Sequence, residues 1–252
     1  MLDYDREAPR YDASRGGEAR AGAAADAIET LISLGLAAGR TKIADVGCGT
    51  GIVTVRLVRA GRSVIGIDRS AGMAAMAAGR MPGRITLGSV SGIPLAGRSI
   101  DVVTMVWLLH LLDAADVAAA VAEAGRVLRP GGLLITTVDK NDAAYGPADD
   151  AVSIVGPVRA RFDHEQTDRL DRVVDVSGRH GLELTAQTSF VGTGQGLSPR
   201  RWRARLTRDD MPWTADAGRE RIDALCAELA KLPDQDRARP DPVYRLVALR
   251  KG

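Results

Sequence analysis

Cysteine is scarce in this 252-residue chain, where it occurs only at Cys48 and Cys226. Two cysteines so far apart offer neither a disulfide framework nor the ligand spacing of a structural metal site. No bound metal is therefore expected. The scarcity fits a reducing compartment, and we expect the protein in the cytoplasm.

Long apolar runs and an excess of one charge are also missing. No stretch approaches the 18 or more apolar residues of a membrane-spanning helix, and residues 1–19 lack the apolar core of a secretion signal. The 34 basic and 32 acidic residues leave a formal net charge of +2. This balance argues against binding nucleic acid by bulk electrostatics. The sequence predicts a soluble protein with no membrane span, no nucleic acid partner, and a monomeric or homodimeric state.

Strand-like and helix-like patterns alternate through the first half of the chain. Helices are predicted over 20–38, 51–61, 71–81 (with Ser70 as its cap) and 114–127 (with Asp113 as its cap). Apolar runs at 42–47, 63–68, 84–89, 99–109 and 133–138 predict five strands. Repeated strand-helix-strand units indicate an α/β fold with a doubly wound parallel sheet, whose ligands gather at the carboxyl ends of the strands.

The pattern loosens after Val138. A loop-rich insertion (139–163), a helix (163–181), a strand (182–194), a largely helical insertion (197–241) and a final strand (242–251) are predicted. The last strand is expected to run antiparallel. We interpret residues 1–252 as a single domain: an N-terminal lid and helix (1–38), a cofactor-binding core (39–138) and an acceptor-side half (139–252).

The segment IADVGCGTG, residues 43–51, joins the first predicted strand to a helix through three glycines. A glycine turn lets a ligand approach the backbone, and a helix N-terminus favours negative charge, so nucleotide-like ligands are the expected occupants. Asp68, at the end of the next strand, is placed to bind two ribose hydroxyls. These features alone also suit a nicotinamide-dependent oxidoreductase.

Two further features favour a different cofactor. The glycine spacing is G-x-G-x-G, whereas a pyrophosphate loop typically reads G-x-G-x-x-G. Asp45 lies just before the glycines, where a carboxylate repels phosphate but attracts an ammonium group or orders the turn. A ligand with a ribose and a cationic amino-acid arm is compatible with the glycine spacing and with both carboxylates, Asp45 and Asp68.

Four segments then occur in a fixed order: IADVGCGTG, VIGIDRSAGM, GSVSGIPLAGRSIDVV and RVLRPGGLLI. They resemble the successive motifs of the class I S-adenosylmethionine-dependent methyltransferases, in particular the small-molecule and quinone-type group. The opening YDREAPRYDASRGG resembles the segment that precedes the core in that family. The resemblance implies a Rossmann-like, mostly parallel seven-stranded sheet with an antiparallel last strand and helical cover over the substrate side. It also implies direct transfer of a methyl group to oxygen, nitrogen or carbon of a small molecule.

The resemblance assigns roles to individual residues. The methionine portion of S-adenosylmethionine would lie along the turn formed by Gly47, Cys48 and Gly49. Asp45 would bind its amino group. Asp68 binds the ribose. The remaining cofactor-binding candidates are Arg69, Met73, Ser89 and Val90 around the adenine, Val106 beneath the cofactor, and Tyr11 and Arg15 as a lid over the methionine carboxylate.

A general base is needed only when the acceptor must lose a proton. His110, Tyr145 and His164 are the candidates, since each lies after a predicted strand or in the insertion that follows. Packing is an open alternative for all three. Trp107 is a candidate for the wall of the acceptor pocket. Three alternative functions stay open: an NAD(P)-dependent oxidoreductase, a catalytically silent cofactor-binding protein and an RNA methyltransferase. If the methyltransferase gene lies beside secondary-metabolite genes, the reaction is expected to be a tailoring step in that pathway.

Overall fold

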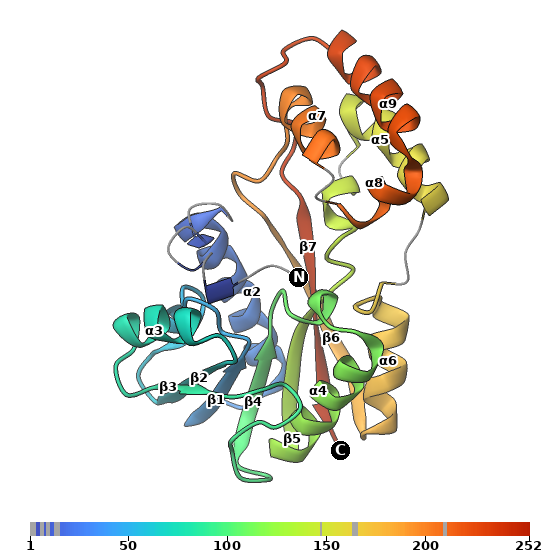
Figure 1. The fold of residues 1–252 in the computed structure, drawn as a ribbon. Coiled ribbons are helices and arrows are strands. Elements are labelled where there is room, and N and C mark those ends of the chain that lie inside the picture. The colour runs from blue at the N-terminus through green and yellow to red at the C-terminus, as the bar shows by residue number, and fades with distance from the viewer. Residues whose placement is uncertain are drawn as a thin grey trace. The chain divides into compact units, whose positions relative to one another are not determined.

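The structure is a computed structural model that describes residues 4–5, 8, 11–12, 16–146, 148–162, 166–208 and 211–252 (Figure 1). The chain divides into two compact units. The first comprises residues up to Lys140 together with Thr167–Phe190 and Tyr244–Gly252, and the second comprises Asn141–Gln166 and Val191–Val243. The interpretation of the whole chain as a single domain stays a prediction, and each unit is described by itself.

The first unit is built on a seven-stranded sheet with the order β3-β2-β1-β4-β5-β7-β6. Neighbouring strands from β3 to β5 run parallel, whereas β7 runs antiparallel to β5. This confirms the predicted doubly wound fold and the direction of the last strand. The strands are β1 (Thr41–Val46), β2 (Arg62–Asp68), β3 (Ile85–Leu87), β4 (Ile100–Met105), β5 (Leu128–Val138), β6 (Leu182–Val191) and β7 (Val243–Lys251).

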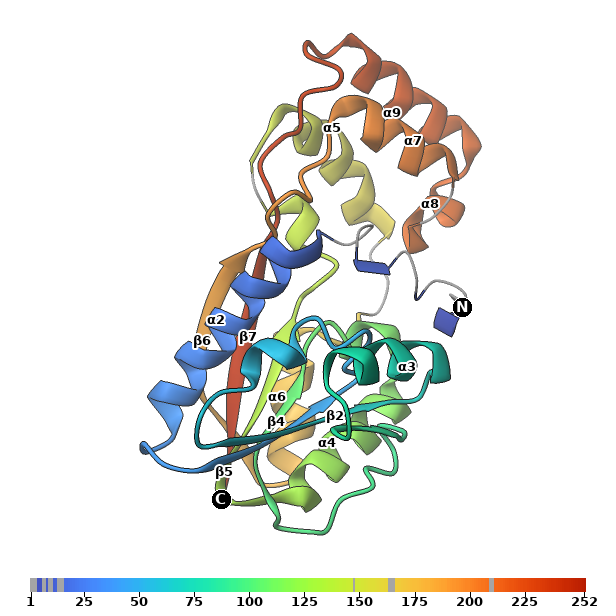
Figure 2. The ribbon, with the colours of Figure 1, turned by 90° about the vertical axis from the view of Figure 1, so that its left-hand side faces the viewer.

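Helices cover both faces of this sheet (Figures 1 and 2). They are α2 (Gly17–Gly35), α3 (Ala71–Arg80), α4 (Ala114–Val127) and α6 (Leu170–Arg179). Successive side chains of a strand point to opposite faces. On β5, Leu133 lies against Gly35 at the end of α2, whereas Leu134 belongs to the same core cluster as Val121 of α4. Burial on both faces explains why the predicted strands read as continuous apolar runs.

The two predicted helix caps are confirmed. Ser70 accepts a hydrogen bond from the backbone N–H of Met73 at the start of α3, at 3.1 Å. Asp113 accepts one from the N–H of Asp116 at the start of α4, at 2.8 Å. Each cap satisfies a backbone donor that has no partner within its own helix.

The helix predicted over 51–61 is wrong. Only Thr54–Leu57 are helical there, as a short 3-10 turn, η1. After Gly51 the segment continues with Ile52, Val53, Thr54 and Val55, whose β-branched side chains lose rotamer freedom in an α-helix. The Thr54 hydroxyl also bonds to the Asp45 carboxylate. The glycine turn therefore leads into a single 3-10 turn, and the expected dipole of a longer helix is missing from the site.

The second unit is helical and has a core of its own. Its elements are α5 (Asp150–Arg159), α7 (Pro199–Arg208), α8 (Pro212–Ala217) and α9 (Arg219–Lys231), with 3-10 turns η3 (Ala143–Tyr145) and η4 (Ala160–Phe162). Trp202 and Leu206 of α7 pack with Ile222, Leu225 and Leu229 of α9. The largely helical insertion predicted over 197–241 is confirmed by α7, α8 and α9, but the segment 139–163, expected to be loop-rich, contains α5.

No helix within the described residues combines the length and the apolar character that crossing a membrane requires.

Candidate functional site

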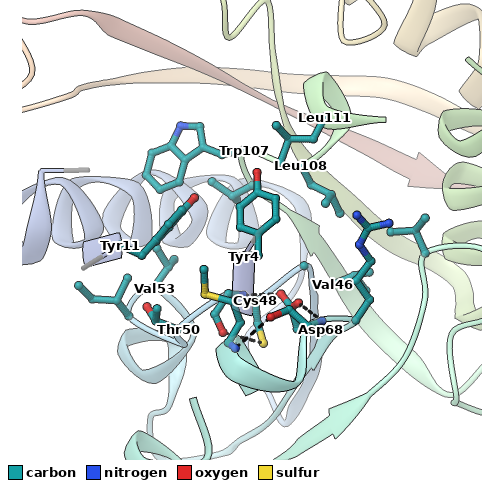
Figure 3. Close-up of a pocket in the computed structure, with 18 of the residues that line it drawn as sticks. Tyr4, Tyr11, Val46, Cys48, Thr50, Val53, Asp68, Trp107, Leu108 and Leu111 are labelled. Carbon is teal, nitrogen blue, oxygen red and sulfur yellow. Dashed lines mark hydrogen bonds between the residues drawn. The ribbon is translucent and has the colours of Figure 1, made fainter. Parts of the chain in front are cut away.

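A cavity of about 460 Å³ lies in the first unit, at the carboxyl ends of β1, β2 and β4. Its size falls in the range of small-molecule sites, roughly 300–1,000 Å³. Figure 3 shows Cys48, Asp68 and Trp107 around it, together with Tyr4 and Tyr11 from the N-terminal residues. The predicted cofactor residues that line it are Tyr11, Gly47, Cys48, Gly49, Asp68, Arg69, Met73, Ser89, Val90 and Val106.

The glycines of the turn have different tasks. All three have positive φ, 72° at Gly47, 56° at Gly49 and 75° at Gly51, which favours glycine. A Cβ at Gly51 would lie 3.0 Å from the Cβ of Ala77, so this glycine lets α3 pack closely. A Cβ at Gly49 would meet no atom within 4 Å, although Gly49 lines the cavity. The space beside Gly49 is thus open to a ligand that approaches the backbone.

Asp68 connects the turn to the end of β2. One carboxylate oxygen accepts a hydrogen bond from the N–H of Gly49 at 2.8 Å, and the other accepts one from the N–H of Ser70 at 2.9 Å. An ionised carboxylate has about four acceptor sites. The half-buried Asp68 therefore shapes the glycine turn and keeps the capacity to accept hydrogen bonds from two vicinal hydroxyls.

Asp45 lies behind the turn. Its side chain is buried, and its oxygens accept hydrogen bonds from the hydroxyls of Thr54 at 2.5 Å and Thr104 at 2.7 Å. Burial raises the pKa of this carboxyl to about 6, against the lowering effect of the two hydroxyls. Asp45 is not among the described residues that line the cavity. These contacts favour the turn-ordering alternative over contact with a cofactor amino group.

Cys48 contributes a wall of the cavity. The residue is 8% exposed, and burial, reinforced by the charges of Asp45 and Asp68, raises the pKa of its thiol. A thiol held in the protonated form is a poor nucleophile. The side chain therefore fills space next to Gly66, where a Cβ would come within 2.9 Å of the sulfur.

The remaining predicted side chains surround the same space. Met73 is buried, whereas Arg69 and Ser89 are exposed. The Ser89 hydroxyl is hydrogen-bonded to that of Ser91 at 3.0 Å. A ligand can therefore meet an apolar wall at Met73 and polar atoms at Ser89.

The described N-terminal residues are fastened to this site through two carboxylates. Asp12 accepts hydrogen bonds from the Thr50 hydroxyl and from Arg80, both at 2.6 Å. Asp5 accepts hydrogen bonds from the hydroxyl of Ser70 at 2.5 Å and the N–H of Gly72 at 2.9 Å.

These contacts place Tyr4 and Tyr11 at the cavity, with ring centroids 6.1 Å apart. Arg15, the other predicted lid residue, lies outside the described residues. The sequence did not predict that Asp5 and Asp12 attach the N-terminal residues to the cavity, because nothing in the local sequence indicates their distant partners.

Trp107 follows β4 with an unusual backbone. Its φ is 54°, which is rare for a bulky residue and indicates a conformation imposed by its surroundings. Its backbone N–H donates a hydrogen bond to the Thr137 hydroxyl at 2.8 Å. Its ring packs edge-on against those of Phe190 and Tyr244, with 5.7 Å between the ring centroids in each pair. The guanidinium carbon of Arg20 lies 3.4 Å from the Trp107 ring centroid.

Arg20 is a cavity-lining residue that sequence reasoning missed. The available signal was a single arginine among the alanines of the predicted helix 20–38.

The three candidate bases are not brought together in the described part of the chain. His110 lies on the 3-10 turn η2 (Leu109–Leu111), and the cavity lining includes Leu108, Leu111 and Leu112 but not His110. Tyr145 belongs to the second unit, where its hydroxyl accepts a hydrogen bond from the Trp213 indole at 3.0 Å and burial raises its pKa. His164 lies outside the described residues. A catalytic role for each stays a prediction.

Comparison with known proteins bears directly on this arrangement. A family model described as "Methyltransferase domain" matches residues 44–136. Residues 44–136 therefore resemble a methyltransferase domain.

Two curated relatives are also named as methyltransferases. An uncharacterized methyltransferase of Mycobacterium tuberculosis is 34% identical over 131 residues, which are 50% of this chain and 53% of that protein. A demethylmenaquinone methyltransferase of Mycolicibacterium paratuberculosis is 35% identical over 106 residues, 42% of this chain and 44% of that protein. The chain spans about half the length of these curated relatives.

A solved structure has a similar fold. It is a chain of the complex between the Trm112 methyltransferase activator and a methyltransferase from Haloferax volcanii. The two share a TM-score of 0.59 and 16% identity, with 100% of this chain and 99% of that chain covered.

Proposed function

We propose that this protein transfers a methyl group from S-adenosylmethionine to a small-molecule acceptor and releases S-adenosylhomocysteine. The observation that carries the proposal is the Asp68 carboxylate, which holds Gly49 at 2.8 Å and faces a cavity where the glycine turn leaves room for a ligand. The family match over residues 44–136 supports the same chemistry.

Each part of the cavity has a physical task in this proposal. Asp68 accepts hydrogen bonds from the ribose hydroxyls, and the open side of Gly49 admits the amino-acid arm. Val46, Val106 and Leu108 present apolar walls that exclude water. The cofactor, when bound, supplies a methyl group on a positively charged sulfur, which is already an activated leaving group. The protein then lowers the barrier mainly by alignment and desolvation.

The acceptor side of the proposal rests on less specific features. A net charge of +2 favours a small molecule over a nucleic acid as the acceptor. We further propose oxygen, nitrogen or carbon as the methylated atom, a tailoring step in secondary metabolism as the biological setting and the cytoplasm as its location. His110, Tyr145 and His164 are the candidates to remove a proton where the acceptor requires it.

The test is a calorimetric titration of the full chain with S-adenosylhomocysteine. We expect binding by the wild type and at least a tenfold loss of affinity in Asp68→Ala, because the ribose acceptor and the link to the turn are both removed. Asp175→Ala is the matched control, since Asp175 is an exposed residue on α6. It should bind like the wild type.

A second titration with NADH separates the rival activity. Saturation by NADH without any response to S-adenosylhomocysteine or S-adenosylmethionine would refute the proposal in favour of an oxidoreductase. Unchanged binding in Asp68→Ala would refute the proposed mode of cofactor binding. Tight binding without a methylated product across a broad acceptor panel would favour a silent cofactor-binding protein.

A further inference from the structure

A leucine-rich segment follows β4, and its side chains divide between the core and the cavity. The leucines are Leu108, Leu109, Leu111 and Leu112. Leu109 is fully buried, and the partly buried Leu108 and Leu112 pack against the same core cluster. Leu111, in contrast, is 43% exposed. Folding explains the apolar character of the other three leucines but does not require it at Leu111.

Leu111 lines the cavity of the first unit. It lies on the 3-10 turn η2, and Leu108 and Leu112, which flank this turn, line the same space. We call these three residues the leucine wall. Figure 3 shows Leu108 and Leu111 above Asp68 in its view, so this apolar part of the lining is separate from the carboxylate at the end of β2.

The leucine wall borders the side of the cavity that solvent reaches, as the exposed fraction of Leu111 shows. In the proposed function, the cofactor occupies the space beside Gly49 and Asp68. An acceptor must then approach from the side that stays open to solvent. An apolar group that covers an exposed leucine releases the water around both surfaces, which favours binding.

We propose that the methyl acceptor carries an apolar group that packs on the leucine wall, and that Leu111 selects for this group. The inference rests on the proposed function and names the class of its acceptor. That class is a small molecule with a nucleophilic oxygen, nitrogen or carbon at one end and an apolar group at the other.

The size of the effect follows from the exposed fraction of Leu111. Full burial of a leucine side chain corresponds to a factor of about 10–150 in affinity. A ligand that covers the 43% still exposed should therefore gain about 3- to 10-fold from this residue. Each methylene group of the ligand that leaves water contributes a factor of about 4.

The test uses para-ethylphenol and para-butylphenol as probes, titrated by calorimetry into the full chain saturated with S-adenosylhomocysteine. The two additional methylene groups should make para-butylphenol bind the wild type about 10-fold more tightly than para-ethylphenol. Leu111→Ser should weaken para-butylphenol binding by about 3- to 10-fold, because it removes the apolar surface at this position. Leu111→Met keeps an apolar side chain and should stay within about twofold of the wild type.

Two further variants complete the design. Leu34→Ser is the matched control, since Leu34 is a 68% exposed leucine on α2 that is not among the described residues lining the cavity. It should bind both phenols like the wild type. Leu111→Ala should show the same direction of change as Leu111→Ser and decides the question if the serine variant does not fold.

The affinity for S-adenosylhomocysteine separates the alternatives. It should change by less than about twofold in Leu111→Ser. Equal weakening of S-adenosylhomocysteine and para-butylphenol would show that Leu111 belongs to the cofactor wall and would overturn the inference. Wild type that binds neither phenol, or equal para-butylphenol affinity in wild type and Leu111→Ser, would overturn it as well. Failure of the wild type to bind S-adenosylhomocysteine refutes the proposed function instead, and phenol titrations of the free protein then decide whether Leu111 binds apolar groups.

Discussion

Replacement of Asp45 by asparagine should stabilise the protein near neutral pH. The carboxyl is buried, and its pKa in the folded protein is about 6, compared with an ordinary value of 3.8. Asparagine has nearly the same shape and no charge to bury. Its amide can meet Thr54 and Thr104, because a hydroxyl can donate or accept a hydrogen bond.

The sign and the size of the effect follow from proton linkage. The folded protein holds the Asp45 proton more tightly than the unfolded chain does, so this stabilising contribution is complete below pH 3.8 and is lost as pH rises through about 6. At about 1.4 kcal/mol per pH unit, the full loss is about 3 kcal/mol by pH 7. About 1 kcal/mol of it falls between pH 5 and pH 7.

The assay is urea unfolding of wild type and Asp45→Asn at pH 5, 6, 7 and 8. The difference between their free energies of unfolding should grow in favour of the variant by about 1 kcal/mol from pH 5 to 7 and then level off. The exposed Asp175→Asn serves as the control and should give a constant difference from the wild type. A pH-independent difference for Asp45→Asn would refute the reasoning, and so would a variant that becomes progressively less stable than the wild type as pH rises.

Two further substitutions test the local geometry of the turn and of α3. Gly51→Ala should lower the free energy of unfolding by about 1–3 kcal/mol, because the new Cβ lies 3.0 Å from Ala77 at a φ of 75°. Gly49→Ala has open space and should cost only about 1 kcal/mol, so equal losses in urea unfolding would contradict the packing role of Gly51. Ser70→Ala removes the cap of Met73 and the partner of Asp5, and thermal unfolding should show a loss of about 1 kcal/mol. An unchanged melting temperature would show that this cap contributes nothing.

Much of the first unit was predictable because its signals are local. Ser70 and Asp113 mark helix starts through hydrogen bonds that span three residues. The apolar runs of β4 and β5 indicate strands that are covered on both faces. The glycine spacing indicates a turn open to a ligand, and its resemblance to a known family extended this to the residues of the cavity wall.

The errors and omissions arose where the outcome depends on distant partners. The segment 51–61 has an apolar pattern suited to a helix, but β-branched residues and the bond from Thr54 to Asp45 leave only one 3-10 turn. Asp45 lies within the glycine motif and looks available to a ligand in the sequence. Its burial at the end of β1, between Thr54 and Thr104, favours the turn-ordering alternative, and contact of Asp45 with a cofactor stays a prediction.

The sequence by itself determined the order of the strands, the position of the glycine turn and the acid at the end of β2, because periodicity and glycine spacing act over a few residues. Only the tertiary structure decided which side chains share the cavity. It stacks Arg20 of α2 on Trp107 after β4, and it joins Asp12 to Thr50 and Arg80. These contacts depend on how helices pack across the sheet, and a local pattern carries no record of that packing.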